Sequence, residues 1–426
     1  MATALDRLGF HFYPDDHHYT DRDLALWLPE LQALGARWLV LRGNSRRAVP
    51  ESFVRGLVKS GIQPIVHIPV EIGSLVRADL DAQLQAYAHW GVRHVAVFDR
   101  PNLRRSWREA DWSRPNLIDR FLDALLPVLQ AQQASGLRPL LPPLEPGGDY
   151  WDTAFLQATL ESLARRAPKT LLSELGICVL AWSHGHPLAW GAGGPSSWKD
   201  ARPYVDPPQG EDQRGIRIFE WYRQIARATL GVDLPMIVTA GGISAGTETV
   251  AEDVQIAEVL AIRRMLASSD DAQGVQAFAF YPLAADPEHP DFALAWYRAP
   301  ASPTSAAQAF LDAASAPAPK SVSEPFAQAG ASRRYILLPS DPLSASGLDW
   351  ATLGRMAVDP GTSMGANVEE AVRYPEVVLA GPITAYPGPV IARLEATGCI
   401  VLRRHHGPAG NPAGATPPHA ACAHAG

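Results

Sequence analysis

Residues 37–70 read RWLVLRGNSRRAVPESFVRGLVKSGIQPIVHIPV, and this stretch decides the fold class. Its two ends, RWLVLRG (37–43) and QPIVHIPV (63–70), are nearly continuous apolar runs, which is typical of strands buried on both faces of a parallel sheet. Between them, PESFVRGLVKSG (50–61) has the pattern of an amphipathic helix and ends in Gly61, where a left-handed C-terminal residue belongs. The stretch therefore predicts one complete strand–helix–strand unit.

The same unit recurs through the first 299 residues, where short apolar runs alternate with amphipathic stretches at fairly even spacing. Eight such strand–helix units, joined by right-handed crossovers, close into a barrel more readily than they form an open sheet. We therefore predict an α/β fold with a (β/α)8 TIM barrel over residues 1–299. The predicted strands are GFHFYP (9–14), RWLVLRG (37–43), QPIVHIPV (63–70), HVAVFDR (94–100), RPLLPPL (138–144), GICVLAW (176–182), PMIVTAG (235–241) and VQAFAFYP (275–282).

The composition changes after the barrel. Residues 300–332 are rich in Ala, Pro and Ser and contain one short helical pattern, so we predict a linker. Residues 333–405 combine strand patterns with helical patterns and predict a small three-stranded α/β domain, whereas residues 406–426 lack apolar periodicity and predict a disordered tail. The predicted strands of the small domain are RRYILLP (333–339), PEVVLAGP (375–382) and CIVLRR (399–404).

The net charge, the apolar segments and the cysteines indicate which partners, location and redox state to expect. A net charge of -7 gives no basic footprint for nucleic acid and disfavours an anionic membrane surface. No window approaches the length of a membrane span, and the N-terminus lacks the pattern of a signal peptide, so the default location is cytoplasmic. Cys178, Cys399 and Cys422 lie in two predicted strands and in the tail, and we expect free thiols rather than disulfides.

The barrel fold itself indicates where ligand-binding residues lie, because active sites of such barrels form at the C-terminal ends of the strands. Aromatic side chains on the loops there offer flat apolar surface to a ligand, while polar groups offer hydrogen bonds. The loop aromatics expected to form a groove are Trp107, Trp112, Trp151, Trp182, Trp190, Trp198 and Tyr281. The residues predicted to bind a ligand are Arg42, Asp99, Arg100, Asn102, Trp151, Trp182, His184 and Tyr281.

At two strand ends the sequence resembles the clan A glycoside hydrolases, and within them bacterial barrels with a small appended α/β domain. In that family the fourth strand ends in Asn-Glu-Pro-Asn, whose Glu is the general acid/base, and the seventh ends in Thr-Glu-Gly-Gly, whose Glu is the nucleophile. The corresponding stretches here are Asp99-Arg100-Pro101-Asn102 and Thr239-Ala240-Gly241-Gly242. LEPGGDYWDTAFL (144–156) and IRIFEWYRQIARATLG (216–231) also resemble the family, and the resemblance covers most of the chain.

The resemblance implies a sugar-sized cleft that has lost both catalytic glutamates. A retaining glycosidase needs two carboxyl groups about 5–5.5 Å apart. Arg100 stays protonated and cannot cycle between acid and base, and Ala240 has no nucleophilic atom. Arg100 is interpreted first as a partner of Asp99 or of another carboxylate at the mouth, and alternatively as a group that grips an anionic sugar or phosphate.

Other carboxylates offer an alternative route to catalysis. Glu145 and Asp149 are the first candidates for an improvised pair, and Glu71 is a further one, although loop carboxylates are usually solvated or cap a helix. No metal or cofactor is expected, because the histidines near the strand ends match no zinc spacing. Those histidines are His17, His18, His184 and His186, with Asp16 beside them.

Three functional hypotheses remain open from the sequence. The first is a carbohydrate-binding pseudoenzyme with a glycoside hydrolase-like barrel. The second is an active glycoside hydrolase that uses Glu145 and Asp149. The third is a scaffold whose barrel mouth is filled and whose small domain binds a protein partner. In that domain PGTSMGAN (360–367) lacks the Lys-Ser/Thr ending of a phosphate loop and is interpreted as a plain loop into a helix.

Overall fold

The computed structural model describes residues 6–204, 212–243, 252–268, 270–315, 334–339, 348, 353–354, 357, 362–372, 374, 376–380, 385–396 and 400–403. The chain divides into two compact units, Met1–Ala318 and Pro319–Gly426, and each is described by itself.

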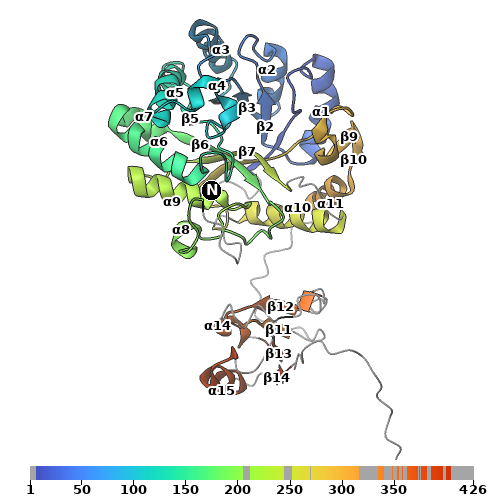
Figure 1. The fold of residues 1–426 in the computed structure, drawn as a ribbon. Coiled ribbons are helices and arrows are strands. Elements are labelled where there is room, and N and C mark those ends of the chain that lie inside the picture. The colour runs from blue at the N-terminus through green and yellow to red at the C-terminus, as the bar shows by residue number, and fades with distance from the viewer. Residues whose placement is uncertain are drawn as a thin grey trace, which may run out of the picture. The chain divides into compact units, whose positions relative to one another are not determined.

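Eight parallel strands form the barrel of the first unit, in the order β4-β3-β2-β1-β8-β7-β6-β5 (Figure 1). The two ends of this order meet, because the amide of Arg138 donates to the carbonyl oxygen of Arg93 at 2.9 Å and His94 pairs with Arg138 in a parallel bridge. The predicted (β/α)8 barrel is confirmed. Its strands are β1 (Leu8–His11), β2 (Trp38–Arg42), β3 (Gln63–Ile68), β4 (His94–Val97), β5 (Leu140–Leu141), β6 (Gly176–Trp182), β7 (Met236–Gly242) and β8 (Val275–Phe280).

The helices surround the strands and cover their outer faces (Figure 1). The first begins at a capping box in which Thr20 and Asp23 bond each other's backbone amides, so the chain turns into a helix soon after β1. The longer helices are α1 (Asp21–Ala33), α2 (Glu51–Lys59), α3 (Arg77–His89), α5 (Leu117–Ala134), α6 (Asp152–Arg166), α9 (Ile218–Leu230) and α10 (Glu252–Ala267). The shorter ones are η1 (Arg104–Ser106), α4 (Glu109–Trp112), α7 (Lys169–Glu174), α8 (Gly194–Ser197) and η2 (Pro290–Leu294). No helix in the described ranges is long and apolar enough to cross a membrane.

Two apolar clusters on opposite faces of the strands hold the barrel together. The larger one packs the outer faces of the strands against the helices, and includes Leu39, Leu41 and Val66. Because side chains alternate between the two faces of a strand, the intervening residues point into the barrel. This inner cluster consists of Val40, Ile65, Ala96, Leu140, Cys178, Ile237, Ala277 and Ala279.

Gly9 in β1 lies so close to β2 that no side chain fits. A Cβ atom at this position would lie 2.7 Å from the Cβ of Trp38 and 2.8 Å from its carbonyl oxygen, and the second contact is with backbone that cannot rotate away. We therefore expect Gly9→Ala to lower the free energy of unfolding by about 1–3 kcal/mol, as overpacking does. Urea unfolding would measure this, and an unchanged midpoint would contradict the close approach of the two strands.

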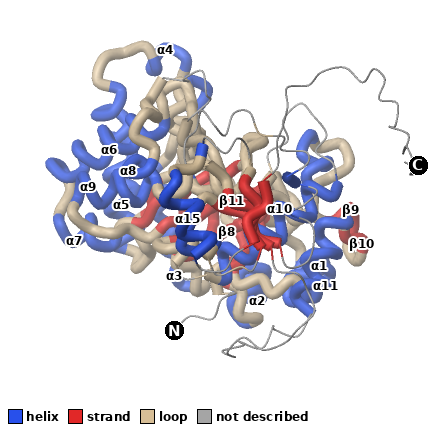
Figure 2. Tube along the Cα trace, turned by 90° about the horizontal axis from the view of Figure 1, so that it is seen from below, coloured by secondary structure: helices blue, strands red, loops and turns tan. Residues whose placement is uncertain are grey.

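The barrel unit extends further along the chain than the sequence predicted. Residues 300–332 were expected to be a linker, but 300–315 contribute to β10 (Ser302–Pro303), which pairs with β9 (Tyr297–Ala299), and to α11 (Ser305–Ser315). Figures 1 and 2 show this hairpin beside α1, and the amide of Ala301 donates to Glu30 at 3.1 Å. Phe310 is fully buried against Trp296 and Phe280, and this burial fixes α11 on the barrel. The linker prediction is wrong for 300–315, and 316–332 lie outside the described residues.

The second unit contains a four-stranded parallel sheet in the order β12-β11-β13-β14. The small α/β domain is confirmed, and its three predicted strands are present as β11, β13 and β14. The fourth, β12, arises from the stretch that was interpreted as a plain loop; that interpretation was wrong because a short strand pairing along β11 needs no apolar run of its own. The elements are β11 (Arg334–Leu337), β12 (Thr362–Gly365), α14 (Val368–Ala371), β13 (Glu376–Leu379), α15 (Gly388–Ala396) and β14 (Ile400–Arg403). The predicted tail, 406–426, lies outside the described residues.

Candidate functional site

Polar side chains continue the inner face of the barrel beyond its apolar cluster. Val40 and Ile65 face inward, so the alternation along β2 and β3 also turns Arg42 and His67 inward. On β1 the outward side chain of Phe10 leaves His11 facing inward in the same way. Three neighbouring strands therefore deliver three nitrogen-bearing side chains to the C-terminal mouth of the barrel.

These residues line a cavity of about 340 Å³ at the C-terminal ends of the strands. The volume falls within the range of small-molecule sites, about 300–1,000 Å³. Of the predicted ligand-binding residues, six of the eight lie here, together with Glu145 and Ala240. The full lining is His11, Arg42, His67, Asp99, Arg100, Glu145, Leu180, Trp182, His184, Thr239, Ala240, Tyr281, Asp291 and Leu294.

Arg100 at the end of β4 holds two carboxylates with one guanidinium group. Its Nε and Nη2 donate to Oδ2 of Asp99 at 3.0 and 2.8 Å, and its Nη1 donates to Oε2 of Glu145 at 3.2 Å. The first interpretation made from the sequence, a pairing of Arg100 with Asp99 or another carboxylate, matches this geometry. The backbone is strained here, since Phe98 and Arg100 have φ values of 73° and 44°.

Electrostatics keep Asp99 and Arg100 charged. Burial opposes ionisation of Asp99, but the charges of His67 and Arg100 offset it and leave the pKa of Asp99 below its usual value. Since burial lowers the pKa of His67 and favours its neutral form, we attribute the effect on Asp99 chiefly to Arg100. Burial also disfavours the charged guanidinium, yet Asp99 and Glu145 raise the pKa of Arg100. Neither Asp99 nor Arg100 is set up to exchange a proton near neutral pH.

A β-bulge at the end of β7 turns two successive residues into the cavity. Val238 pairs with Val179, but the next pair on β6 joins Leu180 to Ala240, so Thr239 is an extra residue. Thr239 and Ala240 both line the cavity as a result. The position that the resemblance assigns to a nucleophile therefore faces the cavity, and it carries only a methyl group.

The three histidines of the cavity are neutral. Burial lowers the pKa of His11 to about 3 and that of His184 to about 4, and it lowers the pKa of His67 as well. His67 Nε2 lies 2.9 Å from the carbonyl oxygen of Phe98 and donates to it when it carries the proton. Nδ1 of His11 and Nε2 of His184 are buried and have no hydrogen-bond partner in the described part of the chain.

Two aromatic rings form one wall of the cavity. Trp182 meets Tyr281 edge-on with ring centroids 5.6 Å apart, and Tyr281 meets His11 at 4.9 Å. The Tyr281 hydroxyl donates to Oδ2 of Asp291 at 2.6 Å, and burial together with this bond raises the pKa of Tyr281. Tyr281 is thus fixed in orientation and presents ring edge and face rather than a free hydroxyl.

Two of the predicted ligand-binding residues lie elsewhere. Asn102 is fully buried and holds the loop after β5: its Nδ2 donates to the carbonyl oxygens of Glu145 and Tyr150 at 2.8 and 2.9 Å, and its Oδ1 accepts from the Glu145 amide at 2.9 Å. Trp151 is buried against Tyr204, with centroids 5.5 Å apart. These two side chains position loops and do not line the cavity.

The predicted aromatic groove is only partly present. Trp182 and Tyr281 line the cavity, but the other loop aromatics pack loops onto the barrel. Trp107, for example, is buried and donates from Nε1 to the carbonyl oxygen of Pro101 at 2.7 Å, and Trp190 stacks on His186 at 4.1 Å. Asp149 also lies outside the cavity lining and accepts from the Arg104 amide at 2.8 Å.

The sequence analysis missed several lining residues. His11 and His67 had a usable signal, since each is a lone histidine inside an otherwise apolar predicted strand. Asp291 and Leu294 come from η2, after the last strand, where no pattern pointed to the site.

The four histidines weighed as a metal cluster do not come together. His184 lines the cavity, His186 stacks on Trp190, and His17 is exposed. Among the described residues, the group with three neighbouring ligand atoms is Asp15, His18 and Asp286, in which both His18 nitrogens already face a carboxylate, at 2.9 and 3.2 Å.

Comparisons with known proteins give only distant likenesses. No protein-family model and no curated protein sequence matches the chain. Among solved structures, similar ones are a family 39 glycoside hydrolase from Bacteroides cellulosilyticus WH2 (15% identity, TM-score 0.49), a glucosidase from Croceicoccus marinus (12%, 0.48) and a monomeric β-xylosidase from Caulobacter crescentus CB15 (12%, 0.45). The alignments cover 74%, 73% and 72% of this chain, and 65%, 67% and 68% of those chains. The (β/α)8 fold of the present chain rests on its own strand order.

Proposed function

We propose that the barrel binds a saccharide in this cavity and does not cleave it by the two-carboxylate mechanism of retaining glycosidases. The observation that carries this proposal is the pairing at the end of β4, where Arg100 binds both Asp99 and Glu145. A carboxyl group held as an anion by a guanidinium cannot act as general acid, and Ala240 supplies no nucleophile opposite it.

The cavity wall supports a sugar as the ligand. Trp182 and Tyr281 offer flat apolar surface to a pyranose ring. His11 and His184 bring imidazole rings to the lining, and one buried nitrogen of each has no hydrogen-bond partner among the described residues. A saccharide combines an apolar ring face with hydroxyl groups that both donate and accept, and so matches this mixture of surfaces.

The alternative of an active hydrolase has one supporting observation, namely that Glu145 lines the cavity. Its proposed partner does not support it, since Asp149 bonds the Arg104 amide outside the lining. The scaffold alternative expected a filled mouth, and the 340 Å³ cavity disfavours it. A protein partner for the small domain remains a prediction.

We expect the purified protein to hydrolyse no member of a broad panel of aryl glycosides and natural oligosaccharides, while binding at least one saccharide by calorimetry. Arg100→Glu/Ala240→Glu restores two carboxyl groups at the strand ends, so glycosidase activity gained by this variant would support a preserved sugar site. The double variant must first show a cooperative melting transition.

Glu145→Gln separates the first two hypotheses, with Asp149→Asn as the matched control. Turnover by the wild-type protein that disappears in Glu145→Gln but persists in Asp149→Asn would overturn the pseudoenzyme proposal. Absence of any saccharide binding, in both wild type and double variant, would remove the proposal of a sugar site.

A further inference from the structure

Arg42 differs from the other charged groups of the cavity because no described residue pairs with it. Its side chain is half-buried at the end of β2 and lines the cavity. Its backbone carbonyl accepts from the Tyr19 hydroxyl at 2.9 Å, but its guanidinium group forms no hydrogen bond or ion pair within the described ranges. A guanidinium carries five donors, and a half-buried one without acceptors is ready to bind an anion.

The carboxylates nearby are engaged by other groups. Arg100 takes Asp99 and Glu145, and the Tyr281 hydroxyl donates to Asp291. The cavity lining thus holds three carboxylates and two guanidinium groups, but none of the three carboxylates lies within ion-pair distance of Arg42.

The imidazole rings near Arg42 are uncharged, and Asp99 is the carboxylate whose pKa the charge of Arg42 also lowers, without an ion pair between the two. The charge of Arg42 contributes to the lowered pKa values of His11 and His67, which shows that both rings lie near it, and both are neutral. His11 lines the same cavity, and its buried Nδ1 has no partner among the described residues. One fixed positive charge beside neutral rings suits a ligand group that carries a single negative charge.

We infer that Arg42 binds a carboxylate of the ligand, so that the saccharide class taken by the cavity is an acidic sugar. This inference rests on the proposed function. A carboxylate fits the guanidinium fork through two parallel hydrogen bonds and balances its charge. A phosphate group would bring nearly two negative charges toward Asp99, Glu145 and Asp291, with one cation to receive them. The geometry therefore favours a carboxylate over a phosphate.

The test compares ligands that differ only in charge. Short oligogalacturonides and their methyl esters have the same rings and linkages, but the ester removes the negative charge. Binding to the full chain is followed by calorimetry and by the change in total tryptophan fluorescence, to which Trp182 in the cavity contributes. We expect the acid form to bind about 10- to 100-fold more tightly than the ester, as for a lost charge-assisted pair.

Two variants locate the effect. Arg42→Gln removes the charge but keeps hydrogen-bonding capacity, and should lower the ratio of the affinities for acid and ester to about one. Arg46→Gln is the matched control, because Arg46 is exposed on the loop that follows β2 and lies outside the cavity lining. Both variants are checked by thermal melting, and the loss of preference is read as a ratio of two affinities measured on the same folded variant.

The outcomes distinguish a failure of the inference about Arg42 from a failure of the proposed saccharide binding. Equal binding of acid and ester, or an acid preference that survives Arg42→Gln, would overturn the inference and leave saccharide binding intact. Inorganic phosphate that displaces the acidic sugar more strongly than acetate does would overturn the assignment to a carboxylate. Binding of cyclohexanecarboxylate as tight as that of the sugar acid, with the same dependence on Arg42, would keep the anion site and overturn the proposed sugar function. If no sugar of either form binds, both statements fail.

Discussion

Asp152→Ala is expected to lower the free energy of unfolding of the barrel by about 3–5 kcal/mol, because three donors, two of them buried, lose their acceptor together. Asp152 is fully buried at the start of α6. Its Oδ1 accepts from the Gly147 amide at 2.8 Å and from Nε2 of Gln213 at 3.0 Å, and its Oδ2 accepts from the Tyr222 hydroxyl at 2.8 Å. These bonds tie the loop after β5 to α9. Urea unfolding followed by tryptophan fluorescence measures the loss, since of the twelve tryptophans only Trp350 lies outside the barrel unit.

Asp152→Asn is the matched control for this prediction. The amide oxygen can replace Oδ1, and the amide nitrogen can donate to the Tyr222 hydroxyl, which rotates to accept. We expect Asp152→Asn to retain most of the stability at neutral pH. A loss as large as that of Asp152→Ala would show that charge, rather than hydrogen bonding, is what the site requires.

The same pair of proteins makes a prediction about pH. Burial raises the pKa of Asp152 from 3.8 to about 6 in the folded protein, so between these values the folded state retains a proton that the unfolded chain releases. Stability contributed by this group is therefore greatest below about pH 4 and falls as the pH rises to about 6, by about 3 kcal/mol in total. Asp152→Asn lacks this titration. The difference in unfolding free energy between wild type and Asp152→Asn should decrease over that interval and be flat above it, and a difference that increases with pH would contradict the assignment.

The barrel could be predicted from the sequence because its signals are local. Each strand is an apolar run such as QPIVHIPV, and most of the helices between strands have an amphipathic pattern that ends near a glycine. The β12 strand was missed for the same reason. Its residues, Thr362–Gly365, form no apolar run, and they become a strand only by pairing along β11.

The site residues could be predicted from the sequence only where they lie at the end of a strand, because the alternation of side chains there sets the direction of each one. Strand-end position brought Arg42, Asp99, Arg100 and Trp182 to the cavity correctly. Asn102 lies only two residues beyond Arg100, but the chain has left the strand there and its side chain turns to hold the next loop. Asp291 lines the cavity but was not predicted to do so. Its contact with Tyr281 across the loop after β8 depends on tertiary folding and produces no periodic pattern in the sequence.

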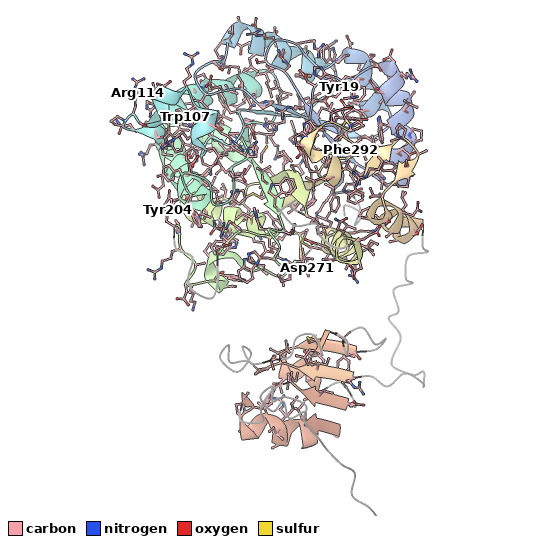
Figure 3. All side chains as sticks on the ribbon, turned by 45° about the vertical axis from the view of Figure 1, so that its right-hand side comes forward. Tyr19, Trp107, Arg114, Tyr204, Asp271 and Phe292 are labelled. Atoms are coloured by element: carbon pink, nitrogen blue, oxygen red, sulfur yellow. The ribbon has the colours of Figure 1, made fainter. Side chains whose placement is uncertain are left out.

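Removal of Arg100 is expected to destabilise the protein in a way that depends on pH. Arg100→Met leaves Asp99 and Glu145 without their shared cation. Both carboxylates lie within hydrogen-bond reach of one guanidinium group, so they also lie close to each other. Breaking a buried ion pair by removing one partner costs about 3–5 kcal/mol; because these side chains are 22–32% exposed, we expect about 1–3 kcal/mol near pH 7. Arg114→Met is the matched control. Figure 3 shows Arg114 at the edge of the barrel unit; its side chain is 64% exposed and pairs with Asp111, so the loss there should stay within about 0.5 kcal/mol.

The sign of the pH effect follows from which state binds the proton. In the wild type the lowered pKa of Asp99 means that its stabilisation is present above the unfolded value of 3.8 and is lost only as the pH falls below it. In Arg100→Met, two neighbouring carboxylates without a cation share a proton that the unfolded chain would release, so this variant gains stability as the pH falls toward about 4. The destabilisation by Arg100→Met should thus be largest above about pH 6 and shrink in acid, whereas that of Arg114→Met should change little. Urea unfolding of wild type, Arg100→Met and Arg114→Met at about pH 5 and about pH 8 measures how the stability loss of each variant depends on pH. Equal losses for Arg100→Met at the two pH values would mean that Asp99 and Glu145 do not depend on Arg100 for their charge, and would remove the observation on which the pseudoenzyme proposal rests.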